Sequence, residues 1–206
     1  MKVLAFDLGG VLIRISRSWE EAAERAGLDL SGVRSGDGSL VRPRGNQADL
    51  QRGVIDFETF VAREGERLEH RYDEASIRRL HDAWLQGEYE GVTGILERLG
   101  RSDVRTACLS NTDAEHWRTL ENLPSLRALD VHALSFRLGR LKPDPAIYHA
   151  AEDLLDATGP SIGFLDDLEE NVEAALRCGW NAIRIDPHEP VAPQIEAALV
   201  AFGIDC

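Results

Sequence analysis

Short apolar runs alternate with stretches of helical periodicity along most of this chain, and no other feature constrains its fold as strongly. Strand–helix alternation of this kind predicts an α/β fold with a doubly wound parallel sheet. Several of the later runs are continuously apolar, so we expect helices to cover both faces of the sheet. The predicted strands are 2–6, 104–109, 131–136, 162–165 and 182–185, and the predicted helices beside them are 92–99, 145–155, 169–177 and 193–202.

One long stretch, from 14 to 88, breaks the alternation and contains no convincing strand. It predicts helices over 18–26, 56–68 and 75–85, with Ser18 and Asp56 as N-caps. The segment 31–47 is rich in glycine and predicts a loop. We therefore predict a small helical cap, residues 14–88, inserted after the first strand of a core domain made of 1–13 and 89–206.

Composition excludes several classes of partner. The 206 residues carry a formal net charge of −13, which would repel a nucleic acid backbone. No apolar run approaches the roughly 20 residues of a membrane span, and we expect no signal peptide, because Asp7 interrupts the first apolar run and no small-residue cleavage site follows. Cys108, Cys178 and Cys206 match neither a zinc site nor a disulfide framework. We expect a cytoplasmic protein without nucleic acid or membrane partners; the oligomeric state is not visible.

Polar side chains follow two of the predicted strands near the centre of the sheet. Asp7 ends the first strand and precedes Gly9 and Gly10. Ser110 and Asn111 follow the strand 104–109. An aspartate before glycines is also common in turns, and serine and asparagine also cap helices, so each signal alone leaves a structural role open.

A second pair of signals lies further along the chain. Asp166 and Asp167 follow a buried strand, and Asn171 comes one helical turn later. Two charges about 4 Å apart repel by roughly 4 kcal/mol at an effective dielectric of about 20, and a hard divalent cation such as Mg²⁺ relieves this. The alternative is that one of the two aspartates caps the following helix and the other faces solvent. Lys142 precedes Pro143, which would hold a lysine in place, although most lysines are solvated.

Because the carboxyl ends of parallel strands meet in one crevice, we expect these side chains to converge there. The combination suits Mg²⁺ and a phosphate monoester. In chain order, the segments 6–12, 109–112, 142–148 and 164–167 with Asn171 resemble the four motifs of the haloacid dehalogenase superfamily. The chain is most similar to the small bacterial α-D-glucose-1-phosphate phosphatases, and is also similar to the phosphatase half of soluble epoxide hydrolase. The resemblance implies a cap that closes over the site and selects the substrate.

The resemblance also implies roles for the site residues. Asp7 would attack phosphorus and form an aspartyl-phosphate. Mg²⁺ would be held by the Asp7 carboxylate, the Gly9 backbone carbonyl and a carboxylate of the fourth motif, for which Asp167 is the first candidate. Asp166 and Asn171 would complete or orient that shell.

The same resemblance implies how phosphate is held. Ser110 and the backbone of Asn111 would bind the transferring phosphoryl group of a small phosphorylated metabolite. Lys142 would neutralise charge on the phosphate and on Asp7. Catalysis would then consist mostly of positioning and charge neutralisation.

One departure from the family pattern is Gly9, where most family phosphatases carry a second aspartate as general acid–base. The chain would then be slow, use leaving groups that need little protonation, or recruit a group from the cap. The alternatives are a catalytically silent phosphate-binding regulator, a metal-independent 2-haloacid dehalogenase and, with less support, a signalling receiver domain. Trp19, Arg42 and Arg44 are either substrate contacts or part of the cap core and its loop, and we expect His81 and His149 to be structural or exposed.

Overall fold

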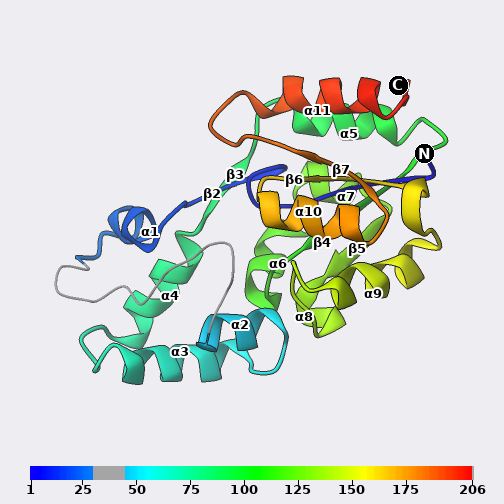
Figure 1. The fold of residues 1–206 in the computed structure, drawn as a ribbon. Coiled ribbons are helices and arrows are strands. Elements are labelled where there is room, and N and C mark those ends of the chain that lie inside the picture. The colour runs from blue at the N-terminus through cyan, green and yellow to red at the C-terminus, as the bar shows by residue number, and fades with distance from the viewer. Residues whose placement is uncertain (30–44, 206) are drawn as a thin grey trace.

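A five-stranded parallel sheet forms the centre of the molecule (Figure 1). The structure, a computed structural model, describes residues 1–29 and 45–205. Phe6 aligns with Cys108 on one side and with Leu165 on the other, so the polar residues that follow these three strands emerge at one edge. In spatial order the strands are β5 (Val131–Leu134), β4 (Arg105–Ser110), β1 (Val3–Phe6), β6 (Ile162–Asp166) and β7 (Asn181–Arg184).

Helices cover both faces of the sheet, as the continuously apolar strands predicted. Because side chains alternate along a strand, Leu4 and Phe6 join one apolar cluster while Val3 and Ala5 join the other. The first cluster includes residues of α5 (Val92–Leu99), α6 (Ala114–Leu120), α7 (Pro124–Arg127) and α11 (Val191–Ala201). The second includes residues of α9 (Pro145–Leu155) and α10 (Glu169–Arg177). Two short elements, α8 (Ser135–Leu138) and the 3₁₀ turn η1 (Gly159–Ser161), complete the connections. The predicted α/β fold is confirmed.

Among the described residues, four helices that follow β2 and precede β3 along the chain lie to one side of the sheet (Figure 1). We call the residues from β2 to β3 the helical insertion. Its helices have a small apolar core of their own, built from Leu50, Phe60, Val61, Leu68 and Ile77. The predicted division into core and cap domains stays a prediction. The elements are β2 (Ile13–Ile15), α1 (Trp19–Ala26), α2 (Gly45–Gln51), α3 (Phe57–Arg67), α4 (Glu74–Asp82) and β3 (Leu85–Glu88).

The expectation that 14–88 lacks strands is wrong, because β2 and β3 form an antiparallel pair. Each is too short to show a periodicity, and they pair only because the insertion returns to its starting point. The helix expected over 75–85 ends at Asp82, because the chain from Leu85 onward forms β3 and pairs with β2. The strand expected over 131–136 ends at Leu134, where α8 begins. The loop expected over 31–47 is wrong from Gly45 onward, where α2 begins.

Other local expectations are met. The Ser18 hydroxyl accepts from the backbone N–H of Glu21 at 3.1 Å, and Asp56 caps α3 in the same way. Cys108 and Cys178 are free thiols. Residues 30–44, with Arg42 and Arg44, and also Cys206, lie outside the described residues. In the described part of the chain, no helix combines the length and apolar character that a membrane crossing requires.

Candidate active site

Three carboxylates meet at the carboxyl edge of the sheet. Asp7 follows β1, Asp166 ends β6 and Asp167 comes next. One oxygen from each of the three lies within 4.8 Å of the others, and all three side chains are buried. The convergence comes from the direct pairing of β1 with β6. The structure therefore brings together acidic residues that are far apart in the sequence.

Lys142 lies among these carboxylates, only 2% exposed. Its Nζ is 2.9 Å from Asp7 Oδ1 and 2.6 Å from Asp166 Oδ2. Burial opposes the charge, but the two carboxylates outweigh it and raise the pKa of Lys142. The backbone of Lys142 is held by the side-chain amide of Asn111, which donates to its carbonyl at 3.0 Å and accepts from its N–H at 2.8 Å. Lys142 is thus a fixed, charged group rather than a solvated one.

The Asn111 side-chain amide is thus engaged with the Lys142 backbone through both its nitrogen and its oxygen. Ser110, at the end of β4, is buried. Within the described residues, its hydroxyl makes no hydrogen bond and is available to a ligand.

Burial is the main reason why the pKa of Asp7 is raised to about 7, and the charges of Asp166 and Asp167 add to it. Lys142 opposes this rise. The Asp7 Oδ1 atom also accepts from the backbone N–H of Leu8 at 2.7 Å. An excess of negative charge in a buried site is what a divalent cation relieves.

The two adjacent aspartates have different surroundings. Both oxygens of Asp166 are engaged: Oδ2 by Lys142, and Oδ1 by the N–H of Leu168 at 2.9 Å and the amide of Asn171 at 3.0 Å. In the described part of the chain, Asp167 has one side-chain partner, Arg17. The Asn171 Oδ1 atom is buried without a hydrogen-bond partner. Free carboxylate and amide oxygens fit a hard cation such as Mg²⁺.

The backbone after Asp7 comes close to this acidic cluster. Gly10 has a φ of +80°, and a Cβ at this position would lie 2.5 Å from the Asp167 carboxylate. Glycine is therefore required both by the conformation and by the space. A Cβ at Gly9 would lie 2.9 Å from Ile15 Cδ1. The space next to Gly9 is thus occupied by a residue of β2.

Sequence reasoning missed Arg17. Its Nη2 lies 2.7 Å from Asp167 Oδ2, and its side chain is 28% exposed. It lies between β2 and α1, at the start of the helical insertion. Nothing in the local sequence distinguishes it from any surface arginine, because its partner comes 150 positions later.

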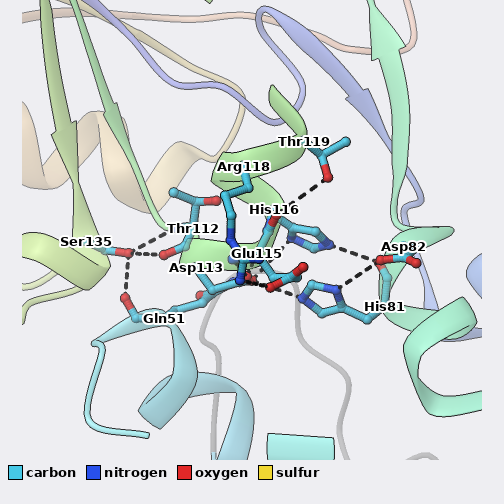
Figure 2. A network of polar contacts seen from close by, with 10 residues as sticks. All are labelled: Gln51, His81, Asp82, Thr112, Asp113, Glu115, His116, Arg118, Thr119 and Ser135. Carbon is cyan, nitrogen blue, oxygen red and sulfur yellow. Dashed lines mark hydrogen bonds and ion pairs between the residues drawn. The ribbon is translucent and has the colours of Figure 1, made fainter. Parts of the chain in front are cut away.

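Sequence reasoning also missed a buried cluster between the insertion and the core (Figure 2). His81 of α4 lies with its Nε2 3.1 Å from Asp113 Oδ2, and His116 Nδ1 lies 3.3 Å from the same oxygen. The two imidazole rings stack with centroids 3.7 Å apart at 18°. Rings so nearly parallel do not aim both nitrogens at one ion, so we interpret the cluster as an ion pair rather than a metal site.

The ion pair has a defined charge state. His81 is buried, yet hydrogen bonds and charges from Asp113 and Asp82 raise its pKa to about 9. Burial and the neighbouring His81 cation lower the pKa of His116 to about 4. Asp113 also caps α6, accepting at Oδ1 from the N–H groups of Glu115 and His116. At neutral pH one imidazolium and one carboxylate therefore join α4 to α6.

Two further features lie at this boundary. The Ser135 hydroxyl donates to the carbonyl oxygen of Gln51 at 2.7 Å, a further polar contact between the insertion and the core (Figure 2). A pocket opens beside the cluster, and its lining includes Trp19, which packs against Trp84 with ring centroids 5.0 Å apart. His149, by contrast, is exposed on α9 and lies 3.2 Å from Glu152.

The ion pair predicts a pH dependence of stability. The pKa of His81 is raised from 6.5 to about 9, so its contribution is complete below pH 6.5 and is lost as the pH rises through 9. The free-energy cost of His81→Gln should therefore shrink by roughly 2–3 kcal/mol between pH 6.5 and 9.5. Urea unfolding of both proteins across this range measures it, with the exposed His149→Gln as control. A cost independent of pH would show that His81 is uncharged.

The sheet and the buried acidic cluster at its carboxyl edge define a Rossmann-like α/β protein with a site suited to a cation and an anionic ligand. Over residues 1–179 the sequence matches the haloacid dehalogenase-like hydrolase family. The chain belongs to this family and is a HAD-like hydrolase.

Similar proteins agree with this assignment. Phosphatase MT3486 from Mycobacterium tuberculosis is 29% identical over 192 residues, which cover 90% of this chain and 88% of that protein. A predicted HAD-like family hydrolase from Porphyromonas gingivalis has a similar structure, with a TM-score of 0.80, 25% identity and coverage of 97% and 98%. The HAD family enzyme bt-2542 from Bacteroides thetaiotaomicron, in complex with magnesium and inorganic phosphate, has a TM-score of 0.77, 23% identity and coverage of 92% and 96%.

Proposed function

We propose that this protein is a magnesium-dependent phosphatase that hydrolyses a small phosphate monoester, such as a sugar phosphate, through an aspartyl-phosphate intermediate. The observation that carries the proposal is the buried set of Asp7, Asp166 and Asp167, two of which contact the ammonium group of Lys142, with Ser110 at the end of the neighbouring strand β4. The name of the mycobacterial relative supports phosphatase chemistry, and the bt-2542 complex supports a family site for magnesium and phosphate.

The residues have distinct roles in this proposal. A carboxylate oxygen of Asp7 attacks phosphorus, and water later cleaves the acyl phosphate to release inorganic phosphate. The Ser110 hydroxyl and the backbone N–H of Asn111 bind the phosphoryl oxygens. Lys142 holds Asp7 in position and offsets negative charge as the phosphoryl group arrives.

The metal would be held by Asp7, the backbone carbonyl of Gly9 and Asp167. The proposal assigns Asp167 rather than Asp166 because both oxygens of Asp166 are already engaged. Asp166 and Asn171 orient this shell. When bound, the ion would supply positive charge to the phosphoryl oxygens.

A metal-independent dehalogenase fits less well. Such an enzyme binds a carboxylate substrate, and the buried charges of Asp7, Asp166 and Asp167 would repel it. A silent phosphate-binding regulator is the alternative that Gly9 suggests. We propose small phosphorylated metabolites as partners, with neither nucleic acid nor membrane, because of the net charge of −13.

The test is turnover of p-nitrophenyl phosphate with magnesium and with EDTA. We expect activity with Mg²⁺, its loss in EDTA and its return with excess Mg²⁺, because the buried carboxylates repel phosphate unless a cation offsets them. Full activity in EDTA would exclude the proposed metal role, and no turnover at all would favour the regulator. A screen of sugar phosphates, nucleotides and FMN then defines the substrate, with α-D-glucose 1-phosphate as the first compound.

A further inference from the structure

Arg17 is the second cation of the acidic site, and the helical insertion carries it. Its guanidinium contacts Asp167 Oδ2 at 2.7 Å, where the Asp167 side chain is only 3% exposed. Lys142 is already bound to two carboxylates. In the part of the chain that the structure describes, the Arg17 guanidinium makes one hydrogen bond, so most of its five N–H groups remain available.

Hydrogen bonds at the base of the helical insertion, where β2 and β3 meet, fix the backbone of Arg17. Its N–H donates to Glu21 Oε2 at 2.7 Å, and Glu21 Oε1 accepts from the amide of Gln86 on β3 at 2.7 Å. The neighbouring Ser16 N–H donates to the carbonyl of Trp84 at 2.8 Å. Figure 1 shows β2 and β3 side by side at this point. The position of the helical insertion relative to the sheet therefore determines where Arg17 lies.

The surroundings of Gly9 give Arg17 a chemical task. Gly9 has no side chain that could protonate a departing oxygen, and the end of the Ile15 side chain lies 2.9 Å from where a Cβ at Gly9 would be. Ile15 belongs to β2, two positions before Arg17. The strand that packs against Gly9 thus also leads to Arg17, whose guanidinium contacts the acidic site.

We propose that Arg17 is a catalytic residue that stabilises the departing oxygen of the phosphate monoester in place of a general acid. This inference rests on the proposed phosphatase function. As Asp7 forms its bond to phosphorus, the bond from phosphorus to the alcohol oxygen breaks. That oxygen keeps the electron pair, is stabilised by the Arg17 N–H groups and takes its proton from water. A guanidinium does not deprotonate, so it lowers the energy of the charged oxygen without transferring a proton.

The first test compares two substrates. The variants are Arg17→Gln and Arg17→Lys, with Arg14→Gln as a control, because Arg14 is exposed on β2 and undergoes the same loss of charge. p-Nitrophenyl phosphate has a stable leaving group, whereas glycerol phosphate has a poor one. Arg17→Gln should lower kcat/KM for glycerol phosphate by about 100-fold and for p-nitrophenyl phosphate by only about threefold. Arg17→Lys should fall between Arg17→Gln and the natural protein.

The second test does not use activity. Arg17 and a cation on Asp167 repel each other, so Arg17→Gln should bind Mg²⁺ about tenfold more tightly by calorimetry. Arg14→Gln should change neither measurement. A residue that only holds the site together would give weaker Mg²⁺ binding and an equal loss on both substrates, and either result would overturn the proposal. If the natural protein turns over neither ester, the phosphatase function itself fails; circular dichroism of each variant checks its fold.

Discussion

Asp7→Asn should abolish turnover, lowering kcat by at least about 10⁴-fold, while the protein remains folded. An amide is nearly the same shape as a carboxylate, but it does not attack phosphorus. Its oxygen still accepts the hydrogen bonds that Leu8 N–H and Lys142 now give to Asp7 Oδ1. Single-turnover assays with p-nitrophenyl phosphate measure the loss. A variant that keeps more than a few per cent of the activity would exclude Asp7 as the nucleophile.

The same substitution should stabilise the protein when metal is absent. Because the pKa of Asp7 is raised from 3.8 to about 7, its carboxyl group costs stability progressively as the pH rises from about 4 to 7. Asp7→Asn removes that cost and should raise the free energy of unfolding by roughly 1–3 kcal/mol at pH 7. Asp153→Asn, on the exposed side of α9, is the control. A lower free energy of unfolding for Asp7→Asn than for the natural protein would show that the attraction of Lys142 outweighs the cost of burying the Asp7 charge.

Asp113→Ala should have the largest effect on stability outside the acidic site. It leaves His81 charged and buried without its nearest carboxylate, and it removes the N-cap of α6. Breaking a buried ion pair typically costs 3–5 kcal/mol, so we expect a loss of roughly 4 kcal/mol and a fall in Tm of about 8–16 °C. Differential scanning calorimetry at pH 7 measures this effect.

Two variants separate the contribution of the ion pair from the contribution of the N-cap. Asp113→Asn keeps a good N-cap but removes the charge, so it should retain only the ion-pair part of the loss. Asp73→Ala removes a comparable N-cap from α4 at an exposed position, and its effect should be much smaller. Equal losses for Asp113→Ala and Asp73→Ala would show that the ion pair with His81 contributes nothing.

Much of the core was predictable because its signals are local. The helices 92–99, 145–155 and 169–177 have the predicted bounds, since their apolar spacing and flanking residues lie within the element itself. The parallel arrangement followed from the continuous apolar runs. The strand pair β2–β3 was missed because its stability comes from pairing across the whole insertion, which no short segment records.

The same difference between local signals and long-range contacts applies to the candidate site. The sequence by itself determined that Asp7, Lys142 and Asp166–Asp167 meet, because both acidic segments end strands whose carboxyl ends share an edge, and Lys142 lies just before α9, which packs on the same sheet. Ser110 ends the neighbouring strand β4. Only the tertiary structure decided that Arg17 contacts Asp167, and that His81 and Asp113 join the insertion to the core. Those contacts depend on how the helical insertion lies against the sheet, and this orientation is set by packing between residues far apart in the chain rather than by any local pattern.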